Sequence, residues 1–228
     1  MTTRRGRCGE WANAFAAVAA AAGLPTRFVV DASDHVWCEV WDEDGATWLH
    51  CDPCEAMADE PLVYEGGWGK APAWVFAFGD GAAVDVTRRY TVVDDGVLAE
   101  RRAGVEVGAV REALAAASAR LAAAVPAERR AAAAARAAAD AAALGGATPV
   151  PAAAPLPGRT AGGAAWIKAR GEDGKGAAQK EGAEAPAPPP PADDFAAQLR
   201  AAFDALRLDG VPPNDAAVEA LKRVHGKA

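Results

Sequence analysis

Residues 34–55 read DHVWCEVWDEDGATWLHCDPCE, and the rest of the chain can be interpreted outward from this stretch. Two runs within it, 35–41 and 47–51, are rich in β-branched and aromatic residues, which favour strands. They flank Asp-Glu-Asp-Gly at 42–45, a composition that is common in tight turns. The pattern therefore predicts an antiparallel β-hairpin.

The predicted hairpin brings an imidazole near a carboxylate. If Glu43 and Asp44 form the turn, His35 lies directly opposite Asp52. If Asp44 and Gly45 form the turn, the pairing shifts by two residues, and His35 and Asp52 become diagonal neighbours that are still within reach. In both registers we expect the two side chains on one face of the sheet.

The flanking sequence adds a helix and further strands. Residues 8–23 are mostly good helix formers, and Gly23 with Pro25 gives a strong stop signal. We expect a strand at 26–30, an irregular segment at 53–68 and a second hairpin from 74–78 and 84–86. A helix followed by an antiparallel sheet predicts the α+β class, with the helix packed on the sheet.

Low-complexity sequence follows the predicted sheet. An Ala-, Arg- and Glu-rich tract divided by Pro126 predicts helices at 107–124 and 127–144, interpreted as a solvated spacer. Runs rich in Pro and Gly predict linkers, and 195–206 with 215–224 predict a helical hairpin, a possible interaction module. We therefore divide the chain into a core (1–95), Ala-rich helices (96–144), a linker (145–192) and the helical hairpin (193–228).

Composition and charge exclude two classes of function. The 228 residues carry a formal net charge of −7, which argues against a broad basic surface for nucleic acid or anionic membrane. No apolar run approaches the roughly 20 residues of a membrane span, and the longest, 11–24, contains Asn13. We expect protein or small-molecule partners, no nucleic acid and no membrane insertion.

The cysteine content indicates a reducing compartment. Four cysteines in 228 residues are too few for a disulfide framework, so we expect free thiols. We therefore expect a cytoplasmic location, with the nucleus as a second location. A removable targeting peptide is an alternative, because Arg4, Arg5 and Arg7 precede an apolar stretch. Glu10 interrupts that pattern and argues against it.

Cys8 is the candidate nucleophile. It precedes a predicted helix, where the positive end of the helix dipole and unpaired backbone N–H groups favour a thiolate. A catalytic thiol also needs an imidazole that moves the proton and a carboxylate that orients the imidazole. The hairpin offers His35 and Asp52 for these roles, so the sequence predicts a Cys-His-Asp enzyme.

Five motifs carry a resemblance to a known family: GRCGEWAN at 6–13, DHVWCEV at 34–40, WLHCDPCE at 48–55, GWGK at 67–70 and VDVTRRY at 84–90. They closely resemble the cytosolic peptide:N-glycanases of the transglutaminase-like superfamily. Residues 156–172 resemble the opening of that family's carbohydrate-binding C-terminal domain. The resemblance implies a transglutaminase-like, papain-like core, of which residues 1–95 would be the C-terminal half.

The resemblance also implies roles for individual residues. Cys8 corresponds to the nucleophile, His35 to the general base and then acid, and Asp52 to the orienting carboxylate. Glu55 resembles the family's substrate-contacting glutamate. The implied substrates are misfolded N-glycosylated proteins, whose glycosylated asparagine would become aspartate during glycoprotein catabolism, and proteasome shuttle factors are partners of the family.

Three aromatic or imidazole side chains have a structural alternative. Trp11 and Trp37 would fit a sugar-facing cleft, but tryptophans of this kind are more often core residues than ligand platforms. His50, next to Cys51 in the predicted strand, is interpreted as a structural imidazole.

The resemblance is incomplete at the metal site. The family holds zinc with two Cys-x-x-Cys pairs upstream of the nucleophile, whereas only seven residues precede Cys8, so we expect no cofactor in this chain. Cys51 and Cys54 with Cys38 would be an alternative zinc site, but a single pair is weak evidence. The resemblance also implies that a tryptophan near the oxyanion is missing, and that the carbohydrate-binding domain ends early, at about residue 172.

Two other functions stay open. A catalytically silent transglutaminase-like scaffold could bind glycoproteins or degradation partners, and the missing upstream half favours this alternative, or else a truncated gene model or a fragment of a longer enzyme. A transglutaminase-like protease or acyl transferase could use the same three residues on another amide.

Overall fold

The computed structural model describes residues 6–146 and 155–174 of the chain. The predicted helical hairpin at 193–228 and much of the predicted linker lie outside these residues. The described residues divide into two compact units, and each is described by itself. The first contains residues 6–28 and 36–60, and the second contains residues 29–35, 61–146 and 155–174. The domain boundaries proposed above stay predictions.

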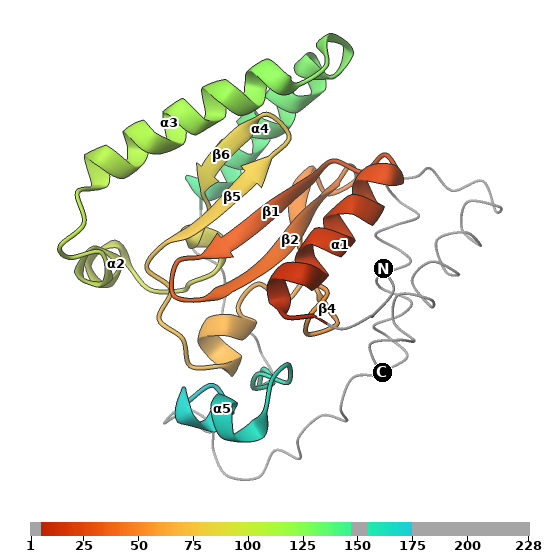
Figure 1. The fold of residues 1–228 in the computed structure, drawn as a ribbon. Coiled ribbons are helices and arrows are strands. Elements are labelled where there is room, and N and C mark those ends of the chain that lie inside the picture. The colour runs from red at the N-terminus through yellow and green to blue at the C-terminus, as the bar shows by residue number, and fades with distance from the viewer. Residues whose placement is uncertain (1–5, 147–154, 175–228) are drawn as a thin grey trace. The chain divides into compact units, whose positions relative to one another are not determined.

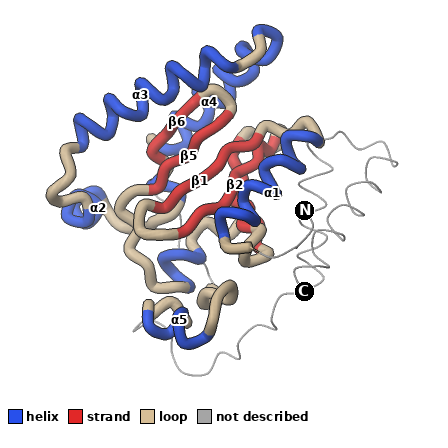
Figure 2. The backbone as a smooth tube through the Cα atoms, viewed as in Figure 1, coloured by secondary structure: helices blue, strands red, loops and turns tan. Residues whose placement is uncertain are grey.

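Six strands form the sheet, in the order β4-β3-β2-β1-β5-β6 (Figure 1). The antiparallel pairs β2–β3, β3–β4 and β5–β6 are formed by neighbours in sequence. Together with a leading helix they confirm the predicted α+β class. The strands, drawn in red in Figure 2, are β1 (Thr26–Asp31), β2 (His35–Asp42), β3 (Thr47–Asp52), β4 (Met57–Ala58), β5 (Val75–Gly79) and β6 (Ala82–Asp85).

Helix α1 (Cys8–Ala21) packs on the β2–β3 hairpin in the first unit. Its N-terminus is capped by the side chain of Glu10, whose Oε2 accepts a 2.7 Å hydrogen bond from the Arg7 N–H. The helix side of the core contains Ala19 and Phe15, which pack with Val40 and Cys51 of the strands. This apolar contact places the N-terminal helix on the face of the hairpin, as the sequence predicts.

The end of α1 confirms the predicted stop signal. Gly23 has φ +81°, a left-handed conformation that glycine adopts without strain. The Leu24 N–H then donates to the Ala19 carbonyl at 3.0 Å, which satisfies a carbonyl of the last helical turn. The chain leaves the helix here and enters β1.

The register of the β2–β3 hairpin is the one expected for an Asp44-Gly45 turn. Cys38 lies opposite Cys51, and Asp42 lies opposite Thr47 at the end of the ladder. The Asp42 Oδ1 accepts the Asp44 N–H at 3.2 Å, an interaction that stabilises the turn. The backbone ladder therefore selects the second of the two predicted registers.

A buried ion pair joins β1 to β2 within the first unit. Arg27 Nε donates to Glu39 Oε2, and the two side chains are 3% and 0% exposed. The Arg27 guanidinium also lies 4.2 Å from the ring centroid of Trp48. A charge this deeply buried requires such partners, so the pair constrains which side chains can pack beneath the hairpin.

The second unit contains the β5–β6 hairpin and the remaining helices. These are α2 (Asp95–Arg101), α3 (Val107–Ala124), α4 (Arg130–Leu144) and α5 (Ala164–Ala169), with the π-helical turn η1 (Val63–Gly67) and the 3₁₀ turns η2 (Thr87–Arg89) and η3 (Ala127–Arg129). The bounds of α3 agree with the prediction, and the second predicted helix begins as η3 and continues as α4. The second hairpin is confirmed, although its return strand begins at residue 82 rather than 84.

Four short elements differ from the sequence-based expectation. The segment 53–68, predicted to be irregular, contains β4 and η1, while α2 and α5 were not predicted. Helix α2 begins with a side-chain cap, because Asp94 Oδ1 accepts the Val97 N–H at 3.0 Å. These elements are two to seven residues long, so hydrophobic periodicity gives almost no signal for them.

We predicted that the Ala-rich tract is a solvated spacer. That prediction is wrong, because polar contacts attach the tract to the β5–β6 hairpin. Helix α3 lies along the edge strand β6 (Figure 1). Ser118 Oγ accepts the Ala83 N–H at 2.9 Å and donates to the Ala83 carbonyl at 3.0 Å, which covers that edge. In α4, Arg136 donates two hydrogen bonds, at 2.7 and 3.0 Å, to the Asp80 carboxylate in the hairpin turn.

Within the described residues, no helix combines the length and the apolar character that crossing a bilayer requires.

Candidate functional site

Cys8 is the first residue of α1, as predicted for the nucleophile. Its side chain is half-buried, and none of the four cysteines forms a disulfide. Cys54 is also half-buried, whereas Cys38 and Cys51 are 0% and 2% exposed. Burial raises the pKa of the Cys38 and Cys51 thiols, and the negative charge of Asp52 contributes further in both. Two of the four cysteines are therefore held as protonated thiols.

Alkylation should follow this difference. In the native chain at pH 8, iodoacetamide should modify Cys38 and Cys51 at least about 100-fold more slowly than Cys8, since each unit of raised pKa lowers the thiolate fraction about tenfold. Peptide mapping by mass spectrometry gives the rate at each site. Denaturant should abolish the difference, and equal native rates at Cys8 and Cys38 would contradict the structure.

Asp52 is the last residue of β3 and is fully buried. Its Oδ1 accepts hydrogen bonds from the Cys54 N–H at 2.9 Å and the Glu55 N–H at 3.3 Å. Backbone donors of this kind hold a carboxylate in one orientation. Glu55, the predicted substrate contact, follows in the same turn and is 2% exposed.

His35 is the first residue of β2 and is 1% exposed. Among the residues of the second unit, its ring lies 4.9 Å from the Trp68 ring and 5.4 Å from the Tyr64 ring, between centroids. Tyr64 belongs to η1 and Trp68 follows it directly. The imidazole therefore packs against aromatic rings from a π-helical turn, a local geometry that is frequent at functional sites.

The backbone turn before His35 is also held. Asp34 has φ +97°, which is uncommon for a residue other than glycine. The Lys70 ammonium donates to the Asp34 carbonyl at 3.0 Å and pairs with the Asp31 carboxylate at 2.5 Å. Lys70 thus stabilises the strained turn that leads into the histidine.

Trp11, Trp37 and His50 take more ordinary positions. Trp11 is half-buried on α1, and Trp37 in β2 is 0% exposed. The Trp37 ring lies edge-on to His50, with centroids 6.1 Å apart, and His50 Nδ1 accepts the Glu60 N–H at 3.3 Å. These contacts are those of a core residue and a structural imidazole, while the substrate roles of both tryptophans stay predictions.

The predicted site residues fall in both units. Cys8, Asp52 and Glu55 lie in the first unit, and His35 is grouped with the second, although it begins the strand β2. The convergence of thiol, imidazole and carboxylate therefore stays a prediction. Tyr64 was missed as a neighbour of His35, because its segment has no strand or helix periodicity; Trp68 lies in a quoted family motif and could have been found there.

A metal site finds no support among the described residues, which contain no group of three His, Cys, Asp or Glu side chains able to hold an ion. The alternative zinc ligands Cys38 and Cys51 are buried thiols with raised pKa values, and Cys38 Sγ donates to the Ala12 carbonyl at 3.2 Å. Zinc binds the thiolate form, which burial disfavours at these two residues in the metal-free chain.

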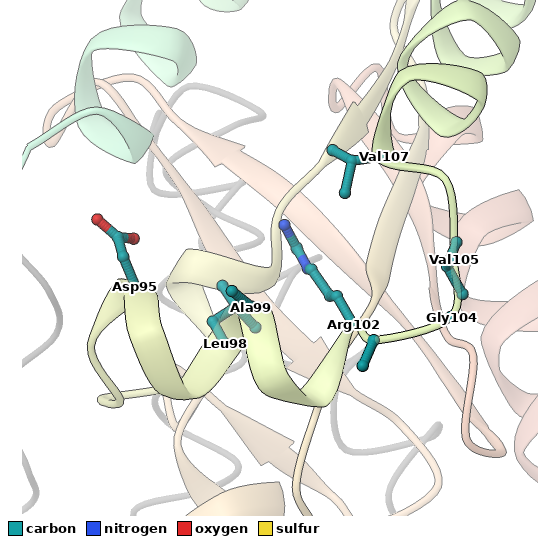
Figure 3. A pocket seen from close by; sticks show the side chains of 8 residues that line it. Asp95, Leu98, Ala99, Arg102, Gly104, Val105 and Val107 are labelled. Carbon is teal, nitrogen blue, oxygen red and sulfur yellow. The ribbon is translucent and has the colours of Figure 1, made fainter.

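A pocket of about 340 Å³ lies between α2 and the start of α3 (Figure 3). Arg102, the basic residue among those that line it, pairs with Asp85 at 2.7 Å and lies 3.9 Å from the Trp74 ring centroid. The pocket is lined by Asp95, Leu98, Ala99, Arg102, Ala103, Gly104, Val105 and Val107, which include no nucleophile and no imidazole. We therefore assign it no chemistry.

Two family profiles match the chain. The profile of the transglutaminase-like superfamily matches residues 1–53, and that of the Rad4 transglutaminase-like domain matches residues 31–112. Among solved structures, a chain of the crystal structure of Rad4-Rad23 bound to a 6-4 photoproduct UV lesion is similar, with a TM-score of 0.41 and 16% identity. That match covers 61% of this chain and 34% of the other.

Curated proteins called peptide-N(4)-(N-acetyl-beta-glucosaminyl)asparagine amidase are similar over longer stretches. The Gallus gallus protein is 42% identical over 174 residues, which are 76% of this chain and 26% of that protein. The Homo sapiens protein is 40% identical over 174 residues, with the same shares. The Yarrowia lipolytica protein is 50% identical over 90 residues, 40% of this chain and 25% of that protein. The chain thus spans about a quarter of the length of these relatives.

Proposed function

We propose that this chain, a homologue of the peptide:N-glycanases with a transglutaminase-like domain, carries an amidase centre that removes N-linked glycans from misfolded glycoproteins. One observation carries the proposal. The transglutaminase-like profile matches residues 1–53, and this segment contains Cys8, His35 and Asp52. The same segment has the helix start and the hairpin register from which the three roles were predicted.

In the proposed site the three side chains act in sequence. His35 takes the proton of the Cys8 thiol, and the Asp52 carboxylate fixes the tautomer and orientation of the imidazole. The support for Asp52 in this role is its complete burial together with the two backbone N–H groups that hold Oδ1. The support for Cys8 is its position as the first residue of a capped helix.

The reaction cleaves an amide and needs no redox partner. The Cys8 sulfur attacks the side-chain amide carbon of a glycosylated asparagine, and the carbonyl oxygen takes the negative charge. As the oxyanion collapses, the C–N bond breaks and His35 protonates the departing glycosylamine. Water, deprotonated by His35, then attacks the thioester, which releases aspartate and restores the thiol.

The substrate and cellular context follow from the same homology. Glycoproteins are the proposed substrates, with Glu55, Trp11 and Trp37 as proposed contacts near the glycan. We propose that the chain is located in the cytoplasm and also in the nucleus, and that proteasome shuttle factors are its partners. No cofactor takes part in the proposed steps.

The test is glycan release in isotopically labelled water. The chain is incubated with a denatured protein that carries one N-glycan, and the product is measured by intact-mass spectrometry. Loss of the whole glycan with a gain of about 1 Da in ordinary water, or about 3 Da in H₂¹⁸O, is expected, because the asparagine nitrogen is replaced by a water oxygen. A sample alkylated with iodoacetamide before the assay is the control and should release nothing.

The other outcomes identify the alternatives. No release by the untreated chain would overturn the proposal in favour of a silent scaffold that binds glycoproteins. Cleavage of the peptide backbone with the glycan retained would instead indicate a transglutaminase-like protease.

A further inference from the structure

We infer that Arg159 is a positioning residue for His35, which it orients through the ring of Trp68. The inference rests on the proposed function, in which His35 is the catalytic base and acid. Residues 155–174 would then help to build the amidase site, although they lie more than 100 positions after His35 in the sequence. The contacts that carry the inference all lie within the second unit.

The first link is the contact of His35 with two aromatic rings. Trp68 and Tyr64 lie 4.9 and 5.4 Å from the imidazole, between centroids, and their rings are 5.1 Å apart in a T-shaped arrangement. Trp68 is 1% exposed and Tyr64 is 1% exposed. The rotation of the imidazole is therefore coupled to the placement of these rings, above all to Trp68, which is the closer one.

The second link is the contact of Trp68 with Arg159. The Arg159 guanidinium lies 4.8 Å from the Trp68 ring centroid and 4.4 Å from that of Trp166. Arg159 is 9% exposed, and a cation–π contact is stronger when the cation is removed from water. Trp68 is thus held by His35 and Tyr64 among its ring neighbours and by a buried cation from a distant segment.

The third link fixes Arg159 itself. Its Nη1 donates to Glu172 Oε2 at 2.8 Å, and its backbone N–H donates to the Glu172 carbonyl at 2.8 Å. Burial raises the pKa of the Glu172 carboxyl, but hydrogen bonds from Arg170 and Arg159 outweigh burial, so its pKa lies below the ordinary value. Glu172 therefore stays ionised at neutral pH and holds the guanidinium in place.

Glu172 also reaches the backbone turn before His35. Its Oε1 pairs with Arg170 Nη2 at 3.0 Å, and the same Nη2 lies 3.2 Å from Asp34 Oδ2. Asp34 directly precedes His35 and has the strained φ described above. The Glu172 carboxylate thus joins Arg159 and Arg170. Arg159 contacts the Trp68 ring that packs on the imidazole, and Arg170 contacts Asp34, the residue before His35.

The backbone packing around these residues leaves no room for side chains. A Cβ on Gly67 would lie 2.1 Å from the Pro157 carbonyl oxygen, and a Cβ on Gly158 would lie 2.5 Å from the Asp173 carbonyl carbon. Glycine is required where two backbones approach this closely. The segment that carries Arg159 is therefore packed directly against the residue before Trp68.

The experiment compares Arg159→Met with wild type in the full chain. Methionine keeps an apolar side chain but removes the cation, so Trp68 should lose its fixed place against the imidazole. Displacement of a catalytic group by about 1 Å lowers kcat up to about 100-fold, so we expect kcat for glycan release to fall about 10- to 100-fold with little change in KM. Arg159→Lys, which keeps the charge, should restore part of kcat.

A spectroscopic signal tests the inference even if the chain releases no glycan. The chain has three histidines, so ¹³C labelling at their Cε1 gives few resonances, and His35→Gln identifies that of His35. The Trp68 and Tyr64 rings shift this resonance, and Arg159→Met should move it. Gly67→Ala, which forces residues 156–158 away without altering a charge, should move it as well.

Arg102→Met is the matched control. Arg102 also lies over a tryptophan and pairs with a carboxylate, but its ring is Trp74 at β5 rather than Trp68. This variant should lose comparable thermal stability and leave the His35 resonance in place. If the His35 resonance and kcat are unchanged in folded Arg159→Met, the positioning role is refuted. If the wild-type chain releases no glycan but Arg159→Met still moves the His35 resonance, the amidase proposal fails while the packing role stands.

Discussion

The Cys8→Ala chain is expected to release glycan about a millionfold more slowly than wild type, which is below detection. Loss of the nucleophile in a thiol or serine enzyme removes the covalent pathway altogether, and the remaining two side chains then contribute little by themselves. Cys8 lies at the start of α1, where alanine is also a good helix former, so folding should be preserved. Glycan release is measured by mass spectrometry, with thermal denaturation to verify the fold.

The matched control for this prediction is Cys54→Ala. Cys54 is the other half-buried thiol, and alanine leaves its backbone N–H available to Asp52. Activity within about twofold of wild type is expected. If Cys8→Ala retains activity and Cys54→Ala loses it, the nucleophile has been assigned to the wrong cysteine.

Asp52→Asn is expected to lower kcat about 10⁴-fold, the loss seen when the carboxylate of such a triad becomes an amide. A carboxylate presents only acceptor oxygens, whereas an amide also presents an NH₂ donor. With the NH₂ group facing the imidazole, the ring nitrogen must accept rather than donate, so the histidine takes the wrong tautomer. The asparagine oxygen can still accept the N–H groups of Cys54 and Glu55, and the turn after β3 should therefore persist. Single-turnover kinetics measure the effect on the chemical step.

Asp42→Asn is the control for a general effect of this substitution. Asp42 ends β2, and its Oδ1 accepts the Asp44 N–H at 3.2 Å, so it has the same kind of turn contact away from the proposed centre. It should leave kcat unchanged. The double variant Cys8→Ala/Asp52→Asn should be no slower than Cys8→Ala, since members of a triad act as a unit; an additional loss of 10⁴-fold would contradict a shared role.

The local elements were predictable because adjacent residues encode them. The start of α1 and its end at Gly23 follow from helix-forming composition and a glycine stop signal, and the β2–β3 hairpin follows from two β-rich runs around a turn. Sequence patterns left two registers open, and the backbone ladder selected the one with Cys38 opposite Cys51. A one-residue slip would turn every side chain to the other face of the sheet, whereas two registers that differ by an even shift keep the same faces.

The predicted spacer was wrong for a physical reason. Alanine-rich helices have little apolar area to bury, and α3 indeed contains no buried residue. The attachment of the Ala-rich tract depends on single polar side chains, such as Ser118 of α3 at Ala83 and Arg136 of α4 at Asp80, and no periodic pattern identifies their partners. The candidate nucleophile and the orienting carboxylate were chosen by residue type and spacing, whereas the aromatic neighbours of His35 required coordinates.

From its sequence alone, this chain could be assigned the α+β class, the leading helix and both hairpins, because each depends on neighbours a few positions apart. The three residues proposed for catalysis lie far apart in the sequence and were selected by residue type, spacing and family resemblance. The three-dimensional packing was needed to find what surrounds His35: the ring of Trp68, the guanidinium of Arg159 and the carboxylate of Glu172. These groups are separated by up to about 137 positions in the chain, and the free energy that brings them together comes from burial and charge pairing across that separation, which short-range patterns do not record.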